Sequence, residues 1–414
     1  MNTFSLFFIS ALLISFGVEY WLSMRQSSHV SQHRDTVPDA FKHSVSLSAH
    51  QKAADYTLAK NKLGDVERII SIVLVLLLTF GGVVNAVFGF YQHMLSSALT
   101  AGLAAIATLM LIMALLELPV SIYQTFVIEE RFGFNKSSVQ QFVKDHLLQM
   151  ILSAAIGLPL LALILWVMES VSNWWLWAWA ILMAFSILMS WLYPTIIAPL
   201  FNTFTPIAEG SLKNRIQNLL ERCGFNSQGI FIMDGSKRSG HGNAYFTGLG
   251  NNKRIVFFDN LVNSLDEEEL EAVLAHELGH FKRKHVIKML IANAVMTLLG
   301  FALLGWLIGQ AWFYQGLGVA SEQQSNASAL LLFMLVSPVF TFFIQPIMTY
   351  CQRQFEFEAD DFASANAKAS KLISGLVKLY EENASTLTPD PLYSAFHYSH
   401  PPAAIRIAHL QTKA

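Results

Sequence analysis

Residues 264–285 read SLDEEELEAVLAHELGHFKRKH, and this stretch decides how the polar part of the chain folds. Apolar residues from Leu270 to Leu278 recur at helical spacing. The acids at 266–269 fall in the first turn, where the helix dipole favours negative charge. The stretch therefore predicts one helix that begins near Asp266.

This helix carries the motif HELGH at 276–280. His276 and His280 are four residues apart, so their rings project from one helical face, and neutral imidazoles so placed can hold one zinc ion. Glu277 can take a proton from a zinc-bound water and later pass it to a leaving amine. The alternative is a surface helix with two unrelated histidines, and the helical pattern around the motif argues against it.

Zinc needs a third protein ligand and an open position for water. The segment RQFEFEADDFASA (353–365) offers acids after the last apolar stretch. Glu356 and Asp360 share one helical face, so one carboxylate can bind zinc while the other holds a ligand histidine. Glu358 points to another face. The alternative is a solvated acidic segment that follows a membrane span.

The composition indicates a membrane protein. The chain has 414 residues, of which 53% are hydrophobic and 14% charged, whereas soluble domains carry about 25% charged residues. A net charge of −2 gives no sign of a nucleic-acid partner. Cys223 and Cys351 show neither metal-ligand spacing nor a disulfide framework.

A helix crosses a bilayer with about 20 mostly apolar residues. The first apolar stretch lacks a basic start and a small-residue cleavage site, so it is read as a retained span. Seven stretches qualify as spans: 3–24, 69–92, 98–126, 149–168, 173–195, 286–312 and 327–350.

The positive charges support this division into seven spans. All but two of the 27 lysines and arginines lie in the alternate segments 25–65, 127–148, 196–285 and 351–414. The opposing segments 1–3, 93–97, 169–172 and 313–326 hold none. Because positive loops stay in the cytoplasm, we expect the N-terminus outside and the catalytic residues on the cytoplasmic side.

The long polar insertion at 196–285 reads as a small α/β unit. The runs GIFIMD (229–234) and RIVFFD (254–259) are strand-length, and 211–225 is an amphipathic helix that ends at Gly224. The predicted fold class is predominantly α, a polytopic membrane protein with seven transmembrane helices and this cytoplasmic insert.

Four parts are expected along the chain. The first five spans occupy 1–195 and the cytoplasmic insert with HELGH occupies 196–285. Spans six and seven occupy 286–350, and a cytoplasmic helical segment with the third zinc ligand occupies 351–414.

Beyond these patterns, nearly the whole chain resembles the type I CAAX prenyl protease family of seven-span membrane zinc proteases. The segments that carry the resemblance are VPDAF (37–41), LPVSIYQTFVIEERFGFNK (118–136), IAPLFNTFTPI (197–207), GSKRSGHGNAYFTGL (235–249), KRIVFFD (253–259), AHELGH (275–280), FEFEAD (355–360) and YSHPP (398–402).

The resemblance implies roles for four residues. Glu356 matches the family's third zinc ligand, and Asp360 matches an aspartate behind a ligand histidine. His400 matches a histidine near the metal, suited to hydrogen-bond the oxyanion of the intermediate. Asn243 matches the edge strand that pairs with the substrate backbone. The family also encloses a water-filled chamber, which Glu117 would face unless it bonds another helix.

Two details depart from the family pattern, and one further histidine lies outside the HELGH motif. The family has an acid before the arginine that follows its HPP, but here Ile405 precedes Arg406, so that salt bridge is expected to be absent, with a cost to C-terminal stability. The tail QTKA lacks a retrieval signal, which suggests a prokaryotic homologue in a plasma membrane. His285 falls on another face than His280 and is expected to be a membrane-boundary residue.

The sequence thus predicts a zinc metalloendopeptidase of the membrane, with one Zn²⁺ per chain. Its expected partners are a peptide or protein substrate, with or without a lipid group, and membrane lipid. A quality-control membrane protease is one alternative. A non-catalytic transporter or lipid-binding scaffold with a vestigial zinc site is another, but such a protein has no need of Glu277.

Overall fold

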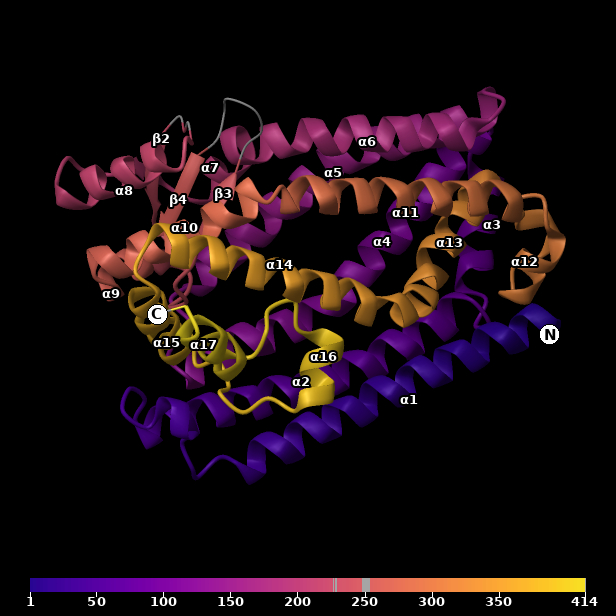
Figure 1. Ribbon diagram of the computed structural model, residues 1–414. Coiled ribbons are helices and arrows are strands. Elements are labelled where there is room, and N and C mark those ends of the chain that lie inside the picture. The colour runs from indigo at the N-terminus through magenta and orange to yellow at the C-terminus, as the bar shows by residue number, and fades with distance from the viewer. Residues whose placement is uncertain (226, 228, 248–253, 414) are drawn as a thin grey trace.

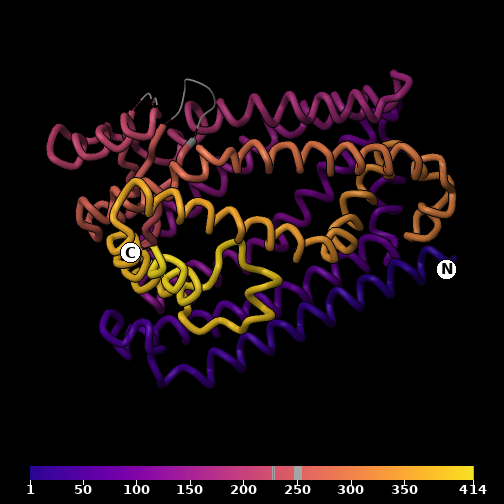
Figure 2. Tube along the Cα trace, viewed as in Figure 1, coloured from indigo at the N-terminus to yellow at the C-terminus, as the bar shows by residue number. Residues whose placement is uncertain are grey.

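The computed structural model describes residues 1–413 apart from 226, 228 and 248–253. Long helices run lengthwise through the molecule, and the small sheet gathers with short helices at one end of them (Figure 1). The trace in Figure 2 has the N-terminus at one end of the long helices and the C-terminus at the other. Residues 248, 249 and 253, which belong to two of the quoted segments, lie outside the described part.

Within the described residues, six helical segments are long and apolar enough to cross a membrane, and a bent helix pair makes a seventh span when counted as one. The first segments are α1 (Thr3–Gln32), α4 (Ala98–Tyr123) with the π-helical η2 (Gln124–Glu129), and α5 (Val139–Ser170). The others are α6 (Trp174–Leu192) with η3 (Tyr193–Ile197) and α7 (Ala198–Phe201), α11 (His285–Leu307), and α13 (Asn326–Thr341) with η6 (Phe342–Ile344) and α14 (Gln345–Asn366).

The second predicted span, 69–92, is not one straight helix. It consists of the end of α2 (Leu47–Leu78) and α3 (Val83–Met94), which meet at a bend of 49°. Gly82 has a φ of 76°, a left-handed conformation that a glycine adopts without strain and that ends one helix direction. The hydrophobicity was read correctly, but the helix-breaking glycine was overlooked.

Other span ends also differ from the prediction, those of the sixth and seventh spans among them. The sixth span ends at Leu307 and is followed by the separate α12 (Ala311–Gly316) rather than continuing to residue 312. The seventh passes through η6, and α14 extends 16 residues beyond the predicted end at 350, to Asn366. The acidic segment therefore belongs to the same helical rod as the last span.

The insertion forms a four-stranded sheet in the order β1-β2-β4-β3. Its strands are β1 (Phe204–Pro206), β2 (Gly229–Met233), β3 (Ala244–Thr247) and β4 (Arg254–Phe258). β2 and β4 are parallel, with Phe231 opposite Val256, and the outer pairs are antiparallel. The predicted strands β2 and β4 are confirmed, β1 was missed, and β3 lies at an edge of the sheet.

Short helices gather around this sheet. They are α8 (Ser211–Arg222), α9 (Asp259–Ser264), α10 (Glu267–Lys282), α15 (Ala369–Glu382) and α17 (Ala403–Gln411), with the 3₁₀ turns η1 (Asp39–Phe41) and η4 (Gly235–Lys237). Two other short elements lie elsewhere: α16 (Pro391–His397) packs against α1 and α14, and the 3₁₀ turn η5 (Ser321–Gln323) lies beside α3 and α12. α8 ends before Gly224, which has a φ of 55°, as its sequence predicts. Ile216, Phe257 and Leu274 belong to one apolar core that joins α8, the sheet and α10.

The long helices line a half-open cavity of about 2230 Å³. It lies among α4, α5, α11 and α13, and its walls are mostly apolar. Glu117 of α4 lines it. Of the two roles open for this acid, the geometry favours facing the chamber.

Candidate metal centre

The helix α10 starts where the sequence predicts. Asp266 and Glu269 form a reciprocal capping box, in which each side chain accepts a 2.9 Å hydrogen bond from the other residue's backbone N–H. Two otherwise unpaired amide groups of the first turn are thereby satisfied, which fixes the helix start. The face that carries His276 and His280 packs against α14.

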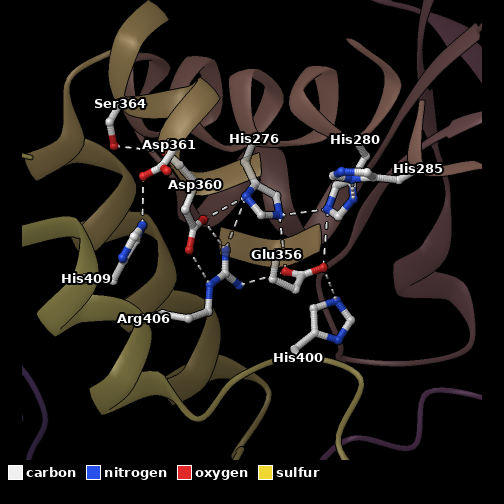
Figure 3. A network of polar contacts seen from close by, with 10 residues as sticks. All are labelled: His276, His280, His285, Glu356, Asp360, Asp361, Ser364, His400, Arg406 and His409. Carbon is white, nitrogen blue, oxygen red and sulfur yellow. Dashed lines mark hydrogen bonds and ion pairs between the residues drawn. The ribbon is translucent and has the colours of Figure 1, made fainter. Parts of the chain in front are cut away.

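Three side chains from these two helices converge on one point (Figure 3). His276 Nε2 and His280 Nε2 are 3.2 Å apart. Glu356 Oε2 lies 3.4 Å from His276 Nε2, and Glu356 Oε1 lies 3.2 Å from His280 Nε2. This is the one group of three such residues with metal-binding spacing in the described part of the chain.

The spacing fits a tetrahedral metal. With bonds of about 2.0–2.1 Å, zinc ligands in a tetrahedron stand roughly 3.3 Å from each other, which is the separation these donors have. Glu356 Oε2 is also buried without a hydrogen-bond partner. A buried carboxylate oxygen in that state is costly unless a cation binds it.

Asp360 holds the first ligand histidine from behind. Its Oδ1 lies 2.8 Å from His276 Nδ1, and Asp360 is fully buried. A hydrogen bond from Nδ1–H to this carboxylate leaves the Nε2 lone pair directed at the metal position. Burial and the charge of Arg406 lower the pKa of His276, but the carboxylates of Asp360 and Glu356 outweigh them and raise it to about 9. The pocket thus favours a cation.

Arg406 is the residue that sequence reasoning missed at this site. It was considered only for an absent salt bridge with position 405, but its guanidinium is buried and binds Asp360 with two hydrogen bonds, of 2.6 and 2.9 Å. Arg406 NH1 also lies 3.5 Å from Glu356 Oε2. The available signal was the family resemblance, which includes an arginine after the HPP segment. Arg406 thus contacts two carboxylates of the metal centre, a role that was not foreseen when its neighbour Ile405 was considered.

His285 is the first residue of the span α11, in line with the expected membrane-boundary position, but it does not face away from His280. It is 2% exposed, and its Nδ1 lies 3.0 Å from Nδ1 of the ligand His280. In a continuous helix these two residues would face different ways, but Lys284 adopts φ 58° and turns the chain between α10 and α11. Glu358, assigned to another face, does point away from the metal position and contacts His285 at 3.0 Å.

The three other predicted residues lie at different distances from this cluster. Glu277 is half-buried, and burial raises its pKa, with the charges of His276 and His280 acting against that rise. His400 is exposed, with Nε2 at 3.3 Å from Glu356 Oε1. Asn243 is exposed just before β3, which packs against α10, and its side chain accepts a 2.8 Å hydrogen bond from Ala244 N–H.

The fold and this site define a class, an integral-membrane metalloprotease with the motif HExxH and a later glutamate. The family model described as CAAX prenyl protease N-terminal, five membrane helices, matches residues 26–203, and the model of peptidase family M48 matches residues 206–414. The chain belongs to peptidase family M48, and within it to the CAAX prenyl proteases.

Known relatives match most or nearly all of the chain. CAAX prenyl protease 1 of Saccharomyces cerevisiae is 35% identical, over 96% of this chain and 93% of its own. The human homolog, from Homo sapiens, is 34% identical over 72% of this chain and 71% of its own. The crystal structure of S. mikatae Ste24p superimposes with a TM-score of 0.90 at 33% identity, and the match covers 99% of both chains.

Proposed function

We propose that this chain holds one zinc ion between His276, His280 and Glu356 and hydrolyses peptide bonds in extended segments of membrane-associated proteins. The single observation that carries the proposal is the preformed triangle of donors, 3.2–3.4 Å apart. Bound zinc supplies a Lewis acid that polarises the scissile carbonyl and acidifies a water molecule.

The other side chains of the site have separate roles in proton transfer and charge stabilisation. The Glu277 carboxylate takes a proton from the attacking water and returns it to the leaving amine, a role that its raised pKa suits. His400, exposed beside the cluster, donates a hydrogen bond from its imidazole to the oxyanion. Asp360 keeps the proton on His276 Nδ1, so that Nε2 stays available to the metal.

The free edge of β3 is the proposed substrate platform. In its antiparallel register with β4, Tyr245 lies opposite Val256 and Asn243 O accepts from Phe258 N–H. Alternate residues of an antiparallel strand direct their backbone groups outward, so those of Ala244 and Phe246 face away from β4, with Ala244 N–H bonded to the Asn243 side chain. An extended peptide can add there as a further strand, close to α10.

Substrates with a prenyl group are the proposed natural class. The names of the relatives, CAAX prenyl protease 1, support it, and the mostly apolar cavity among the long helices suits a lipid-modified chain. The charge pattern supports a cytoplasmic active site and an outside N-terminus. A prokaryotic plasma membrane and contact with membrane lipid are further parts of the proposal.

The test is cleavage by purified protein in detergent, with zinc content measured in parallel. Wild type and E277Q are compared on a farnesylated CAAX-type peptide and on the same peptide without its lipid. We expect E277Q to keep zinc and to lose activity about 10²–10⁴-fold, as for removal of a general base. Equal cleavage of both peptides favours a quality-control protease. Full zinc content without any cleavage would instead support a non-catalytic scaffold or transporter.

A further inference from the structure

A second histidine stands behind the metal ligand His280 and connects it to a carboxylate. His280 Nδ1, the ring nitrogen that faces away from the donor triangle, lies 3.0 Å from His285 Nδ1. His285 Nε2 in turn lies 3.0 Å from Glu358 Oε2. Figure 3 shows the two imidazoles side by side, with His280 between His285 and Glu356.

The carboxylate determines where the protons of this pair lie. A carboxylate accepts hydrogen bonds, so His285 Nε2 carries a proton and donates it to Glu358. In the neutral ring His285 Nδ1 is then an acceptor. Two nitrogen atoms 3.0 Å apart need one proton between them, and that proton lies on His280 Nδ1. His280 Nε2 is consequently left with its lone pair directed at the metal position.

The surroundings hold His285 in this orientation. Its ring is 2% exposed and stacks on Phe355 of α14, with centroids 4.3 Å apart and planes at 13°. Glu358 also faces Lys288, at 3.5 Å, whose positive charge keeps the carboxylate ionised. The left-handed residue Lys284 turns the chain so that the first residue of α11 reaches back to α10.

From this geometry we infer that His285 is a positioning residue for the metal centre, which acts through His280 with Glu358 as its anchor. The inference rests on the proposed zinc site. Both ligand histidines are then fixed by carboxylates of the same helix, His276 directly by Asp360 and His280 through one further imidazole. Partners of this kind typically change metal affinity about 10–100-fold when removed.

Two substitutions separate positioning from packing. H285F keeps a flat ring on Phe355 but removes both nitrogens. H285N loses the ring, while its amide oxygen can still accept from His280 Nδ1–H. Positioning predicts zinc affinity in the order wild type, H285N, H285F. Packing alone predicts the reverse order for the two variants.

The chain offers a matched control in His409. This residue also bonds a carboxylate of α14, Asp361, at 2.8 Å, and lies against a phenylalanine of that helix, Phe357, at 5.0 Å. It makes no contact with the ligand histidines in the described structure. H409F should therefore leave zinc affinity unchanged.

The experiment measures the zinc dissociation constant by competition with a chromophoric chelator, and the rise in melting temperature when zinc is added to zinc-free protein. That rise reports metal binding, because a packing defect that destabilises the zinc-free and zinc-bound forms equally cancels in the difference. We expect H285F to weaken zinc binding about 10–100-fold, and the Co²⁺-substituted protein to change its visible absorption. An H285F protein that binds zinc within twofold of wild type overturns the inference.

If H285F does not fold, substitutions of Glu358 test the inference instead, because this side chain is 44% exposed and contributes little to packing. E358L removes the acceptor and should weaken zinc binding, whereas E358Q keeps an acceptor and should change it less. Equal affinities of E358L and wild type overturn the inference. A wild type that binds no zinc overturns the proposed function and this inference together.

Discussion

Replacing Gly279 by alanine should disturb the metal centre without touching a ligand. A Cβ atom at this position would lie 2.8 Å from Ala359 Cα and 3.0 Å from Ala359 O. Carbon atoms in contact stand about 3.5–4.0 Å apart, so α10 and α14 must separate by roughly 0.7 Å or more. The two ligand histidines are on one of these helices and the glutamate is on the other.

The displacement exceeds what a zinc site tolerates, because its bond lengths vary by only about 0.2 Å. We expect G279A to weaken zinc binding by about tenfold or more, at roughly 1.4 kcal/mol per factor of ten. Overpacking should lower the stability of the zinc-free protein by about 1–3 kcal/mol. Chelator competition measures the first quantity and thermal unfolding of the zinc-free protein the second.

Gly17 of α1 provides the control, since an added Cβ there meets no heavy atom within 4 Å. G17A should keep wild-type zinc affinity and lose no stability, because alanine is the better helix former. The reasoning is refuted if G279A binds zinc within twofold of wild type and its zinc-free form unfolds at an unchanged temperature.

Three other substitutions test separate parts of the structure. R406M should destabilise the zinc-free protein by about 3–5 kcal/mol in thermal unfolding, because it removes the guanidinium from the buried Asp360 and leaves that carboxylate with its bond to His276; a loss below 1 kcal/mol would contradict this. Burial raises the pKa of Glu269, but bonds such as that from Lys378 outweigh it and leave the pKa below its ordinary value. The stability advantage of wild type over E269Q should therefore be constant above about pH 5 and shrink as the pH falls below about 4; an advantage independent of pH in denaturant titrations would refute the assignment. N243A should raise KM for a peptide substrate about tenfold and change kcat less, and an unchanged KM would argue against docking at this edge.

Much of this architecture could be read from the sequence because its signals are local. Apolar length predicted the number of spans, and four-residue spacing brought His276 and His280 onto one face. The same spacing grouped Glu356 with Asp360. The roles of His400 and Asn243 came from the family resemblance rather than from any pattern in the residues, and they stay predictions, as does the division into four parts.

The features that were missed depend on chain reversals and distant contacts. Gly82 bends a span whose hydrophobicity is continuous. Lys284 turns the chain so that His285 meets His280, against the periodicity of a single helix. Arg406 reaches Asp360 across 46 positions in the sequence. A rule based on the spacing of nearby residues cannot predict such a contact.

Because α14 continues the last span, the position of Glu356 depends on how that span is tilted in the bilayer. Glu356 lies eleven positions after the start of α14 at Gln345, a lever of about 16 Å at 1.5 Å per residue. A lipid layer that is too thin or too thick tilts a span, and a tilt of about 3° moves the end of this lever by roughly 0.9 Å, beyond the tolerance of about 0.2 Å for a zinc ligand. We therefore expect zinc affinity to change with acyl-chain length in reconstituted vesicles, and equal affinity in short- and long-chain lipids would contradict it. On this view, membrane thickness acts as a regulator of the protease.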